Sequence, residues 1–318
     1  MSRPQYGRAA STNLGGGRGY RMLEEKVAIV TGASRGKFAE ALVEHLELTH
    51  LQGIGAAVCE NLAGKGCSLV MNYTSDSSAE RTEKLASKLR SEHGIKTVTV
   101  QADMGSEGGP AYVVNTAKNN LQHPKTGKFQ VDIVINNAGI SVNKSIEDCD
   151  AEDFASQYNV NVRGPLFLMQ AVLPYLPHDR SGRIVNLSSV SASLGFKAQS
   201  VYGGTKAALE AMTRTWAREL SERATVNAIN PGPVFGDMYS GTSDEFKMNM
   251  QPWMKITPLA AVRDGVDSQD VIEGSKIAGG RAAYDHEIAG VVAMLCSPDA
   301  GWSTGSVVCA NGGLRFSV

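Results

Sequence analysis

The feature that most constrains the fold is a regular alternation of short β-branched runs with longer stretches of helical pattern. Each apolar run is short enough for a strand, and turn residues separate it from the helical stretch that follows. Parallel strands joined by helical crossovers produce this alternation. We therefore predict an α/β fold with a doubly wound parallel sheet of about seven strands and helices on both faces. The predicted strands are Val27–Thr31, Ser68–Asn72, Thr97–Gln101, Ile133–Asn136, Arg183–Leu187, Thr225–Ile229 and Ser306–Cys309.

One long segment does not share the alternation. Residues 233–280 are rich in Met, Gly and charge, and they follow the sixth predicted strand. Because ligands of doubly wound sheets bind beyond the carboxyl ends of the strands, we predict that this irregular segment is a substrate lid. The alternative is a surface loop with no role in function. The helices are predicted at Ala79–His93, Ala111–Asn120, Asp150–Val160, Pro165–Tyr175, Tyr202–Glu222 and His286–Cys296.

Length and composition fit a single enzyme-sized domain. The 318 residues are 42% hydrophobic and carry a formal net charge of −1, so no global field recruits nucleic acid or an anionic membrane. No apolar run approaches the roughly 18 residues that span a bilayer. The five cysteines show no metal-type spacing, which favours reduced thiols and a cytoplasmic protein. Residues 1–22 are basic and predicted to be a disordered tail, with a mitochondrial signal as the alternative; residues 23–318 form the domain.

A strand that runs into a glycine-rich turn is the first candidate binding feature. Residues 27–36 read VAIVTGASRG. Glycines at such a turn let the backbone approach a pyrophosphate, which the N-terminus of the following helix attracts. The helix start expected after Gly36 arrives only as Ile54-Gly55, so residues 37–53 interrupt the turn.

The interruption has two explanations. Residues 37–53 include a stretch rich in Ala, Leu and Glu, which suits an inserted short helix. They also fit a retained intron, because Gly36-Lys37 can be encoded with the splice-donor-like string GTAAG, and Leu48-Thr49-His50 with the branch-point-like string CTAAC. In either case the segment enters where backbone amides must converge on phosphate. We therefore expect the chain without it to bind a dinucleotide more tightly.

A tyrosine and a lysine four positions apart form the candidate catalytic pair. Reduction of a ketone needs a hydride at carbon and a proton at the oxygen. A free tyrosine has a pKa near 10, as an order of magnitude, and a nearby ammonium group lowers it. Tyr202 and Lys206 share one face of a predicted helix. We predict Tyr202 as the proton donor and Lys206 as the group that tunes it; the alternatives are a helix-start aromatic and a surface charge.

These motifs resemble the classical short-chain dehydrogenase/reductase family over nearly the whole chain except residues 37–53. The glycine turn resembles its TGxxxGxG signature, Asn136–Gly139 its NNAG motif, and Tyr202–Lys206 its YxxxK motif. Within the family, the chain is most similar to 3-oxoacyl-carrier-protein reductases and fungal ketone reductases. The resemblance implies a single-domain Rossmann fold, an oxidoreductase acting on CH–OH and C=O groups, and a homodimer or homotetramer.

The resemblance also implies roles for single residues. Ser189 orients the carbonyl, Asn161 holds a water linked to Lys206, and Lys206 also grips the ribose of the cofactor. Asp103 contacts the adenine, with a helix N-cap as the alternative. The implied catalytic set is Asn161, Ser189, Tyr202 and Lys206, with no metal. The implied cofactor-binding set is Gly32, Ser34, Arg35, Gly36, Ile54, Thr74, Ser75, Asp103, Asn137, Ala138, Gly139, Tyr202, Lys206, Pro231, Gly232 and Val234.

The end of the second strand favours NADPH over NAD. A carboxylate there accepts hydrogen bonds from the 2′-hydroxyl of NAD, but the strand end reads VMNYTS over residues 70–75 and has no carboxylate until Asp76. By resemblance to NADPH-preferring members, Arg35, Thr74 and Ser75 form a 2′-phosphate pocket. One departure concerns the nicotinamide end, where Gly236 replaces the family's threonine and backbone groups of Val234 must compensate.

We therefore predict an NADPH-dependent oxidoreductase that reduces a ketone or aldehyde to an alcohol by hydride transfer. Its partner is a small carbonyl or alcohol substrate, not a nucleic acid or a membrane. Two alternatives remain. One is a catalytically impaired nucleotide-binding protein, because the phosphate loop is interrupted. The other is an NAD-dependent alcohol dehydrogenase.

Overall fold

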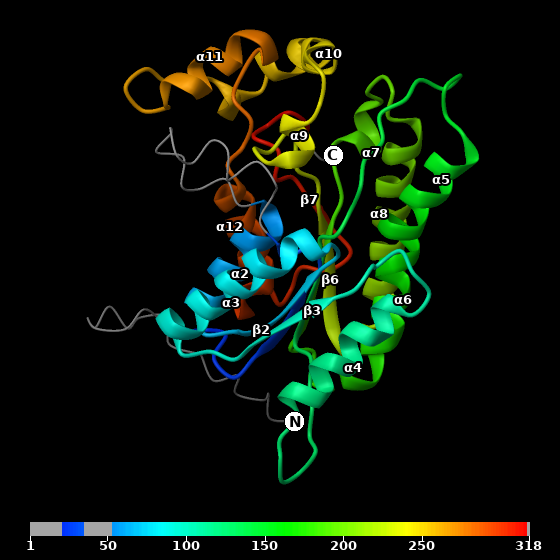
Figure 1. Cartoon of the computed structure of the whole chain (residues 1–318), viewed down its shortest axis with the longest axis vertical. Coiled ribbons are helices and arrows are strands. Elements are labelled where there is room, and N and C mark those ends of the chain that lie inside the picture. Colours follow the sequence, from blue (N-terminus) through cyan, green and yellow to red (C-terminus); the bar gives the residue numbers. More distant parts are fainter. Residues whose placement is uncertain (1–20, 35–52, 317–318) are drawn as a thin grey trace, which may run out of the picture.

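A seven-stranded, all-parallel sheet forms the centre of the molecule (Figure 1). The computed structural model describes residues 21–34 and 53–316. The strand order is β3-β2-β1-β4-β5-β6-β7, which confirms the predicted doubly wound sheet. The observed strands match the predicted ones to within one residue at each end: β1 (Val27–Val30), β2 (Ser68–Tyr73), β3 (Thr97–Gln101), β4 (Ile133–Asn136), β5 (Gly182–Leu187), β6 (Ala224–Ile229) and β7 (Val307–Val308).

Helices cover both faces of the sheet (Figure 1). Alternate strand residues pack on opposite sides: Val30 joins one hydrophobic cluster and Ile29 the other. Because both faces of the central strands are buried, β1 and β4 are almost continuously apolar. The edge strand β3 alternates Thr and Val and is only partly buried. The first face packs on α2 (Ile54–Gly64), α3 (Ala79–His93) and α12 (Asp285–Cys296), and the second on α4 (Gly109–Leu121), α6 (Gly164–Val172) and α8 (Ser200–Glu219).

The helix predicted at Asp150–Val160 has a different end. Asp150 caps α5 (Ala151–Tyr158) in a capping box with Asp153, which fixes its start. The chain then makes a π-helical turn, η2 (Asn159–Arg163), before α6 begins. Such π turns are uncommon and are found mostly at functional sites. The smaller elements are η1 (Asp76–Ser78), η3 (Leu173–Tyr175), α7 (Ser191–Leu194) and η5 (Pro298–Ala300).

The segment predicted as irregular, residues 233–280, is largely helical, so that expectation was wrong. It forms α9 (Asp237–Ser240), α10 (Asp244–Lys255), η4 (Pro258–Ala260) and α11 (Gln269–Ala278). Pro252 inside α10 obscured its helical pattern, although Ser243 caps the helix by accepting a hydrogen bond from the backbone of Phe246.

Both ends of this segment meet at its base. The N–H of Ala283 donates to the carbonyl of Pro233, and the N–H of Phe235 donates to the carbonyl of Ala283, so Val234 and Ala283 form a parallel bridge. Helices α9, α10 and α11 therefore stand together above the carboxyl edge of the sheet (Figure 1). We call residues 236–282 the lid segment.

Several other expectations concern the whole chain. The predicted tail at 1–22 and the interruption at 37–53 lie almost entirely outside the described residues. All five cysteines are free thiols, and burial raises the pKa of Cys296 to about 12. Across residues 21–34 and 53–316, no helix has the length and hydropathy to cross a membrane, and no cluster of three ligating side chains is placed to hold a metal ion.

Candidate active site

The glycine turn after β1 packs directly against the start of α2. Gly32 has a φ of 63°, which favours glycine. A Cβ added to Gly55 would collide with the carbonyl oxygen of Gly32. The two halves of the motif are therefore in contact, although residues 37–53 separate them in sequence. Ser34 and Ile54 flank this contact; Arg35 and Gly36 lie outside the described residues.

The N-terminus of α2 suits a bound anion. Its N-cap is Gly53, no side chain in the described part of the chain caps it, and its first turn contains no acidic residue. The first amides of a helix lack intrahelical partners and attract negative charge. Because β1 and β4 are neighbours at the point where the strand order reverses, this helix end borders the crevice where such sheets bind nucleotides. A dinucleotide pyrophosphate fits these residues.

The turn after β4 is locked to the turn after β1. The Thr31 hydroxyl accepts hydrogen bonds from the backbone N–H groups of Asn137 and Ala138, each at 3.0 Å. The Asn137 amide donates to the carbonyls of Thr31 at 2.8 Å and Gly32 at 3.0 Å. The residues of the NNAG motif therefore brace the two turns against each other.

Asn161 lies in the π turn and is buried. Its side-chain oxygen accepts from the N–H of Ile140 at 2.9 Å, and its amide nitrogen lies 2.9 Å from the Ile140 carbonyl and 3.0 Å from the Thr205 hydroxyl. A Cβ on Gly139 would lie 3.3 Å from the Asn161 oxygen and 3.4 Å from Nζ of Lys206. Asn161 and Lys206 therefore meet beside Gly139, where any larger residue would crowd them.

Tyr202 and Lys206 lie side by side on α8, and both are buried. Nζ of Lys206 is 5.6 Å from the centre of the Tyr202 ring and donates a 2.7 Å hydrogen bond to the Leu187 carbonyl. Burial raises the pKa of Tyr202 to about 12 and lowers that of Lys206 to about 8. Desolvation dominates the pKa of Tyr202, and Lys206 is not among the groups that shift it, so the lowering predicted from Lys206 is not observed. At neutral pH the phenol keeps its proton and the amine stays charged.

Ser189 completes the group at the end of β5. Its hydroxyl accepts from the N–H of Ser191 and donates to the Ser191 hydroxyl, both at 3.1 Å. Its hydrogen bond to the phenol lowers the pKa of Tyr202, partly opposing the effect of burial. The structure thus brings Ser189, Tyr202, Lys206 and Asn161 together at one edge of the sheet.

The residues after β2 and β3 form a separate, exposed part of the crevice. Thr74 and Ser75 are exposed at the end of β2, and the side chain of Asp76 accepts a 2.6 Å hydrogen bond from the Gln101 amide. Asp103 accepts at 2.8 Å from the N–H of Gly105. The N-cap of α4 is instead Gly108, so the alternative interpretation of Asp103 as a helix cap was wrong.

The turn after β6 carries the remaining predicted residues. The carbonyl of Pro231 accepts a 3.0 Å hydrogen bond from the N–H of Val190, which ties this turn to the one that bears Ser189. The parallel bridge leaves the backbone groups of Val234 directed away from Ala283. Gly236 has a φ of 147°, a conformation that a threonine adopts only with strain.

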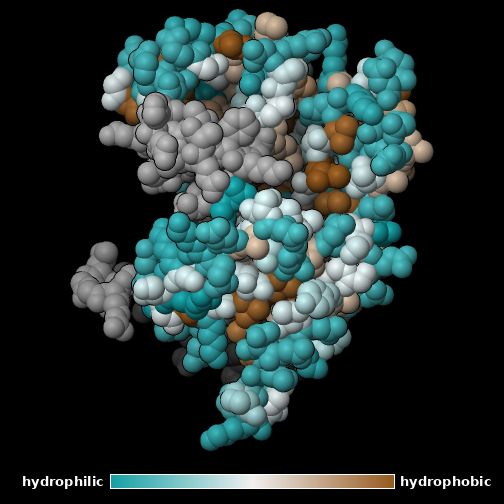
Figure 2. Space-filling view, in the orientation of Figure 1, coloured by the Kyte–Doolittle hydropathy of each residue, from teal (hydrophilic) through white to brown (hydrophobic). Residues whose placement is uncertain are grey.

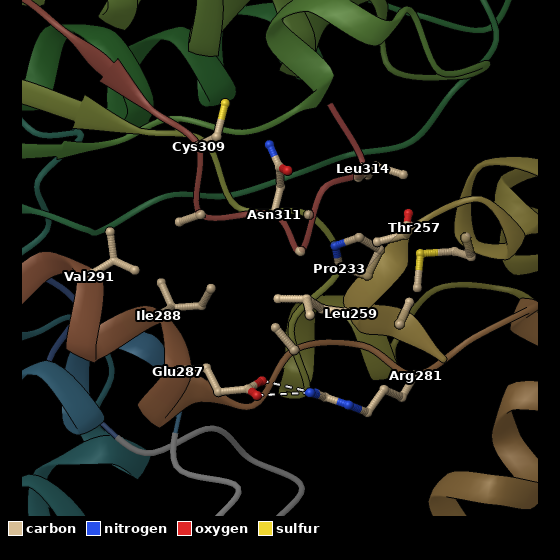
Figure 3. A pocket seen from close by; sticks show the side chains of 16 residues that line it. Pro233, Thr257, Leu259, Arg281, Glu287, Ile288, Val291, Cys309, Asn311 and Leu314 are labelled. Carbon is tan, nitrogen blue, oxygen red and sulfur yellow. Dashed lines mark hydrogen bonds and ion pairs between the residues drawn. The ribbon is translucent and has the colours of Figure 1, made fainter. Parts of the chain in front are cut away.

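A cavity of about 210 Å³ lies on the other side of this turn, between the lid segment, α12 and the C-terminal loop (Figure 3). Gly232 and Pro233 form part of its wall, but Ser189, Tyr202 and Lys206 do not. Arg281 makes a bidentate ion pair with Glu287 at 2.9 and 2.8 Å on one wall. The cavity is mostly apolar, and its Arg–Glu pair joins the base of the lid segment to α12.

Sequence reasoning missed several side chains that hold the site in place. Asn72 accepts from the N–H of Gly32 and bonds to the β3 strand. The Thr205 hydroxyl accepts a hydrogen bond from the Asn161 amide, and the Ser191 hydroxyl accepts one from Ser189. The Ser188 hydroxyl donates a hydrogen bond to the Glu210 carboxylate beside the tyrosine–lysine pair. The one available signal was proximity to a motif residue, since these positions carry no pattern of their own.

A doubly wound sheet has an anion-binding helix end at its switch point, and a buried tyrosine and lysine with a half-buried serine lie nearby. Together these features define a dinucleotide-binding oxidoreductase of the Rossmann type. Residues 49–315 match the family model described as enoyl-(acyl carrier protein) reductase. The chain belongs to the short-chain dehydrogenase/reductase family, and it is an oxidoreductase of CH–OH and C=O groups.

Individual relatives agree with this placement. The chain is 49% identical to an L-xylulose reductase of Aspergillus niger, over 93% of this chain and 99% of the relative. It is 47% identical to an L-xylo-3-hexulose reductase of Hypocrea jecorina, over 94% and 99% of the two chains. Among solved structures, a blue fluorescent protein from a metagenomic library, crystallised in complex with NADPH, superimposes with a TM-score of 0.73 at 29% identity, over 93% and 100% of the two chains.

Proposed function

We propose that this protein is an NADPH-dependent reductase that converts a small polyhydroxylated ketone, a ketose, to the corresponding alcohol. The observation that carries the proposal is the buried contact of Tyr202 with Lys206 and Ser189 at the carboxyl edge of the sheet. The ketose class is taken from the two relatives that are 49% and 47% identical over nearly their whole length.

The cofactor supplies hydride to the carbonyl carbon when it is bound. The first amides of α2, with Gly32, Ser34 and Ile54 around them, would hold its pyrophosphate. Arg35 and Gly36, which lie outside the described residues, belong to the same proposed set. The braced turn at Asn137, Ala138 and Gly139 would support the adjoining ribose, and Pro231, Gly232 and Val234 would face the nicotinamide.

Side chains of this protein supply the proton that the reduction needs. Tyr202 donates its phenolic proton to the carbonyl oxygen as that oxygen becomes an alkoxide. The charged Lys206 beside it stabilises the phenolate left behind and would grip the nicotinamide ribose. Ser189 donates a hydrogen bond that orients the carbonyl oxygen, and Asn161 would hold a water that returns a proton through Lys206.

Preference for NADPH rests on the exposed end of β2. Thr74 and Ser75 offer hydroxyls to a 2′-phosphate, and the nearest acid, Asp76, is engaged by Gln101. Arg35 would add a guanidinium. Asp103, at the end of β3, would face the adenine. The structural relative crystallised with NADPH supports the same choice.

The lid segment is proposed to cover the substrate. Trp253 of α10 contacts Phe196, which lies in the loop before α8, with ring centres 6.3 Å apart. Figure 2 shows apolar side chains in the hollow between the lobe of α10 and α11 and the lobe of α5 and α7. Met250 and Met254 of α10 are buried, whereas Met248 is exposed, so of these three methionines only Met248 is at the surface.

A direct assay tests the proposed function. We expect the purified chain, and the form lacking residues 37–53, to oxidise NADPH in the presence of L-xylulose or a 3-hexulose faster than with a simple aliphatic ketone. Charge-assisted contacts to the 2′-phosphate should favour NADPH over NADH by about 10- to 100-fold in kcat/KM. If both forms bind NADPH but reduce no carbonyl in the panel, the protein is a catalytically impaired nucleotide-binding protein, which is the alternative that the interrupted turn suggested. Preference for NADH would indicate an NAD-dependent alcohol dehydrogenase instead.

The pKa of Lys206 predicts a pH dependence. Because burial lowers that pKa to about 8, the stabilising positive charge is present below this pH and is lost as pH rises through it. We expect kcat for reduction to fall above a pH of about 8 at saturating NADPH. In Lys206→Arg the guanidinium stays charged, so the remaining kcat of this variant should not fall above a pH of about 8. The same decline in both proteins would contradict this origin.

A further inference from the structure

A third residue on α8 continues the line of Tyr202 and Lys206. Glu210 is four positions after Lys206, so the three side chains leave the helix on the same side. Glu210 is half-buried on a helix whose other acidic residue, Glu219, is exposed. No step of the proposed reduction uses it.

Glu210 is joined to the residue that precedes Ser189. The hydroxyl of Ser188 donates a 2.6 Å hydrogen bond to the Glu210 carboxylate. Ser188 is buried, and its backbone N–H donates to the Ile229 carbonyl at 2.8 Å. A short hydrogen bond to a carboxylate is charge-assisted and stronger than one between neutral groups.

Three consecutive residues at the end of β5 therefore contact three side chains of α8. The Leu187 carbonyl accepts from Lys206, Ser188 donates to Glu210, and the Ser189 hydroxyl lies near enough to Tyr202 to lower the pKa of its phenol. The strand end cannot shift along the helix without losing all three contacts. The middle contact is the one whose members take no part in the proposed chemistry.

We propose that Glu210 is a positioning residue, which acts through Ser188 to hold the Ser189 hydroxyl against the Tyr202 phenol. This inference rests on the proposed function, because the geometry it preserves is that of the proton-donating group. Without the Glu210 contact the residue pair 188–189 gains freedom, and the hydrogen bond of Ser189 to the phenol is populated less of the time. Substrate orientation then weakens, whereas the cofactor residues on β1, α2 and β4 are untouched.

The kinetic test uses Glu210→Ala, Ser188→Ala and the double variant, with Glu219→Ala on the exposed side of α8 as the matched control. We expect each single variant to lower kcat for ketose reduction about tenfold, in line with one charge-assisted hydrogen bond. The double variant should be no slower than either single variant, because both remove the same contact. Glu210→Gln keeps an acceptor oxygen and should stay within about threefold of the parent. The dissociation constant for NADPH should be unchanged throughout.

A second readout does not depend on turnover. In protein labelled with 3-fluorotyrosine, the fluorine resonance of residue 202 is assigned by its loss in Tyr202→Phe. It should move in Glu210→Ala and Ser188→Ala, and stay in place in Glu219→Ala. If the parent reduces no ketose but this shift occurs, the proposed function fails and the positioning role stands. If the enzyme is active and both kcat and the resonance are unchanged in Glu210→Ala, or if the two single effects multiply in the double variant, the positioning role is wrong.

Discussion

Replacing Tyr202 by phenylalanine should lower kcat for ketose reduction by about 100- to 10,000-fold while the protein stays folded. The substitution removes only the hydroxyl, so the ring still fills its buried place beside Lys206. It takes away the proton that the carbonyl oxygen needs. The two described neighbours of the phenol do not replace this proton, since Ser189 is far less acidic than a phenol and Lys206 is directed to the Leu187 carbonyl.

The measurement is steady-state kcat with saturating NADPH, together with the thermal midpoint and the dissociation constant for NADPH. Both of the latter should stay close to those of the parent. Tyr112→Phe on α4 is the matched control, because that tyrosine is exposed and lies on a different helix from Tyr202 and Lys206; its kcat should be unchanged. A Tyr202→Phe enzyme that keeps most of its turnover would overturn the proton-donor assignment.

Deleting residues 37–53 should tighten NADPH binding by about 10- to 100-fold, the equivalent of one recovered charge-assisted hydrogen bond to phosphate. The deletion joins Gly36 to Ile54, so a glycine again precedes the first residue of α2. Gly53 holds that place with a φ of 83°, which glycine adopts readily. The contact of Gly55 with Gly32 already exists, so the shortened turn would connect two segments that are already in place.

Isothermal titration of the parent and the deletion form with NADPH measures the change. A third protein, in which residues 37–52 are replaced by a Gly/Ser sequence of equal length, separates the effect of length from that of composition; it should bind as weakly as the parent. Equal dissociation constants for the parent and the deletion form would refute the prediction. Sequencing the spliced transcript decides independently between an inserted helix and a retained intron.

Much of the architecture was predictable because it depends on local pattern. The strands are short and rich in β-branched residues, so β1 to β7 stood out from the helices between them. The catalytic candidates were predictable for a related reason: a phenol and an amine four residues apart on a helix must share one side of it. The helices of the lid segment were missed because Pro252 and many exposed polar residues weaken the helical period there.

What the amino-acid sequence determined by itself was the α/β alternation and the chemical identity of Tyr202, Lys206, Ser189 and Asn161. Only the tertiary structure decided how deeply that group is buried, and hence that desolvation moves the pKa values of Tyr202 and Lys206 away from each other. It also decided that a π turn carries Asn161 to Gly139, and that Glu210 reaches Ser188. Burial and contacts of this kind depend on residues far apart in the chain, and no local spacing records which of them will meet.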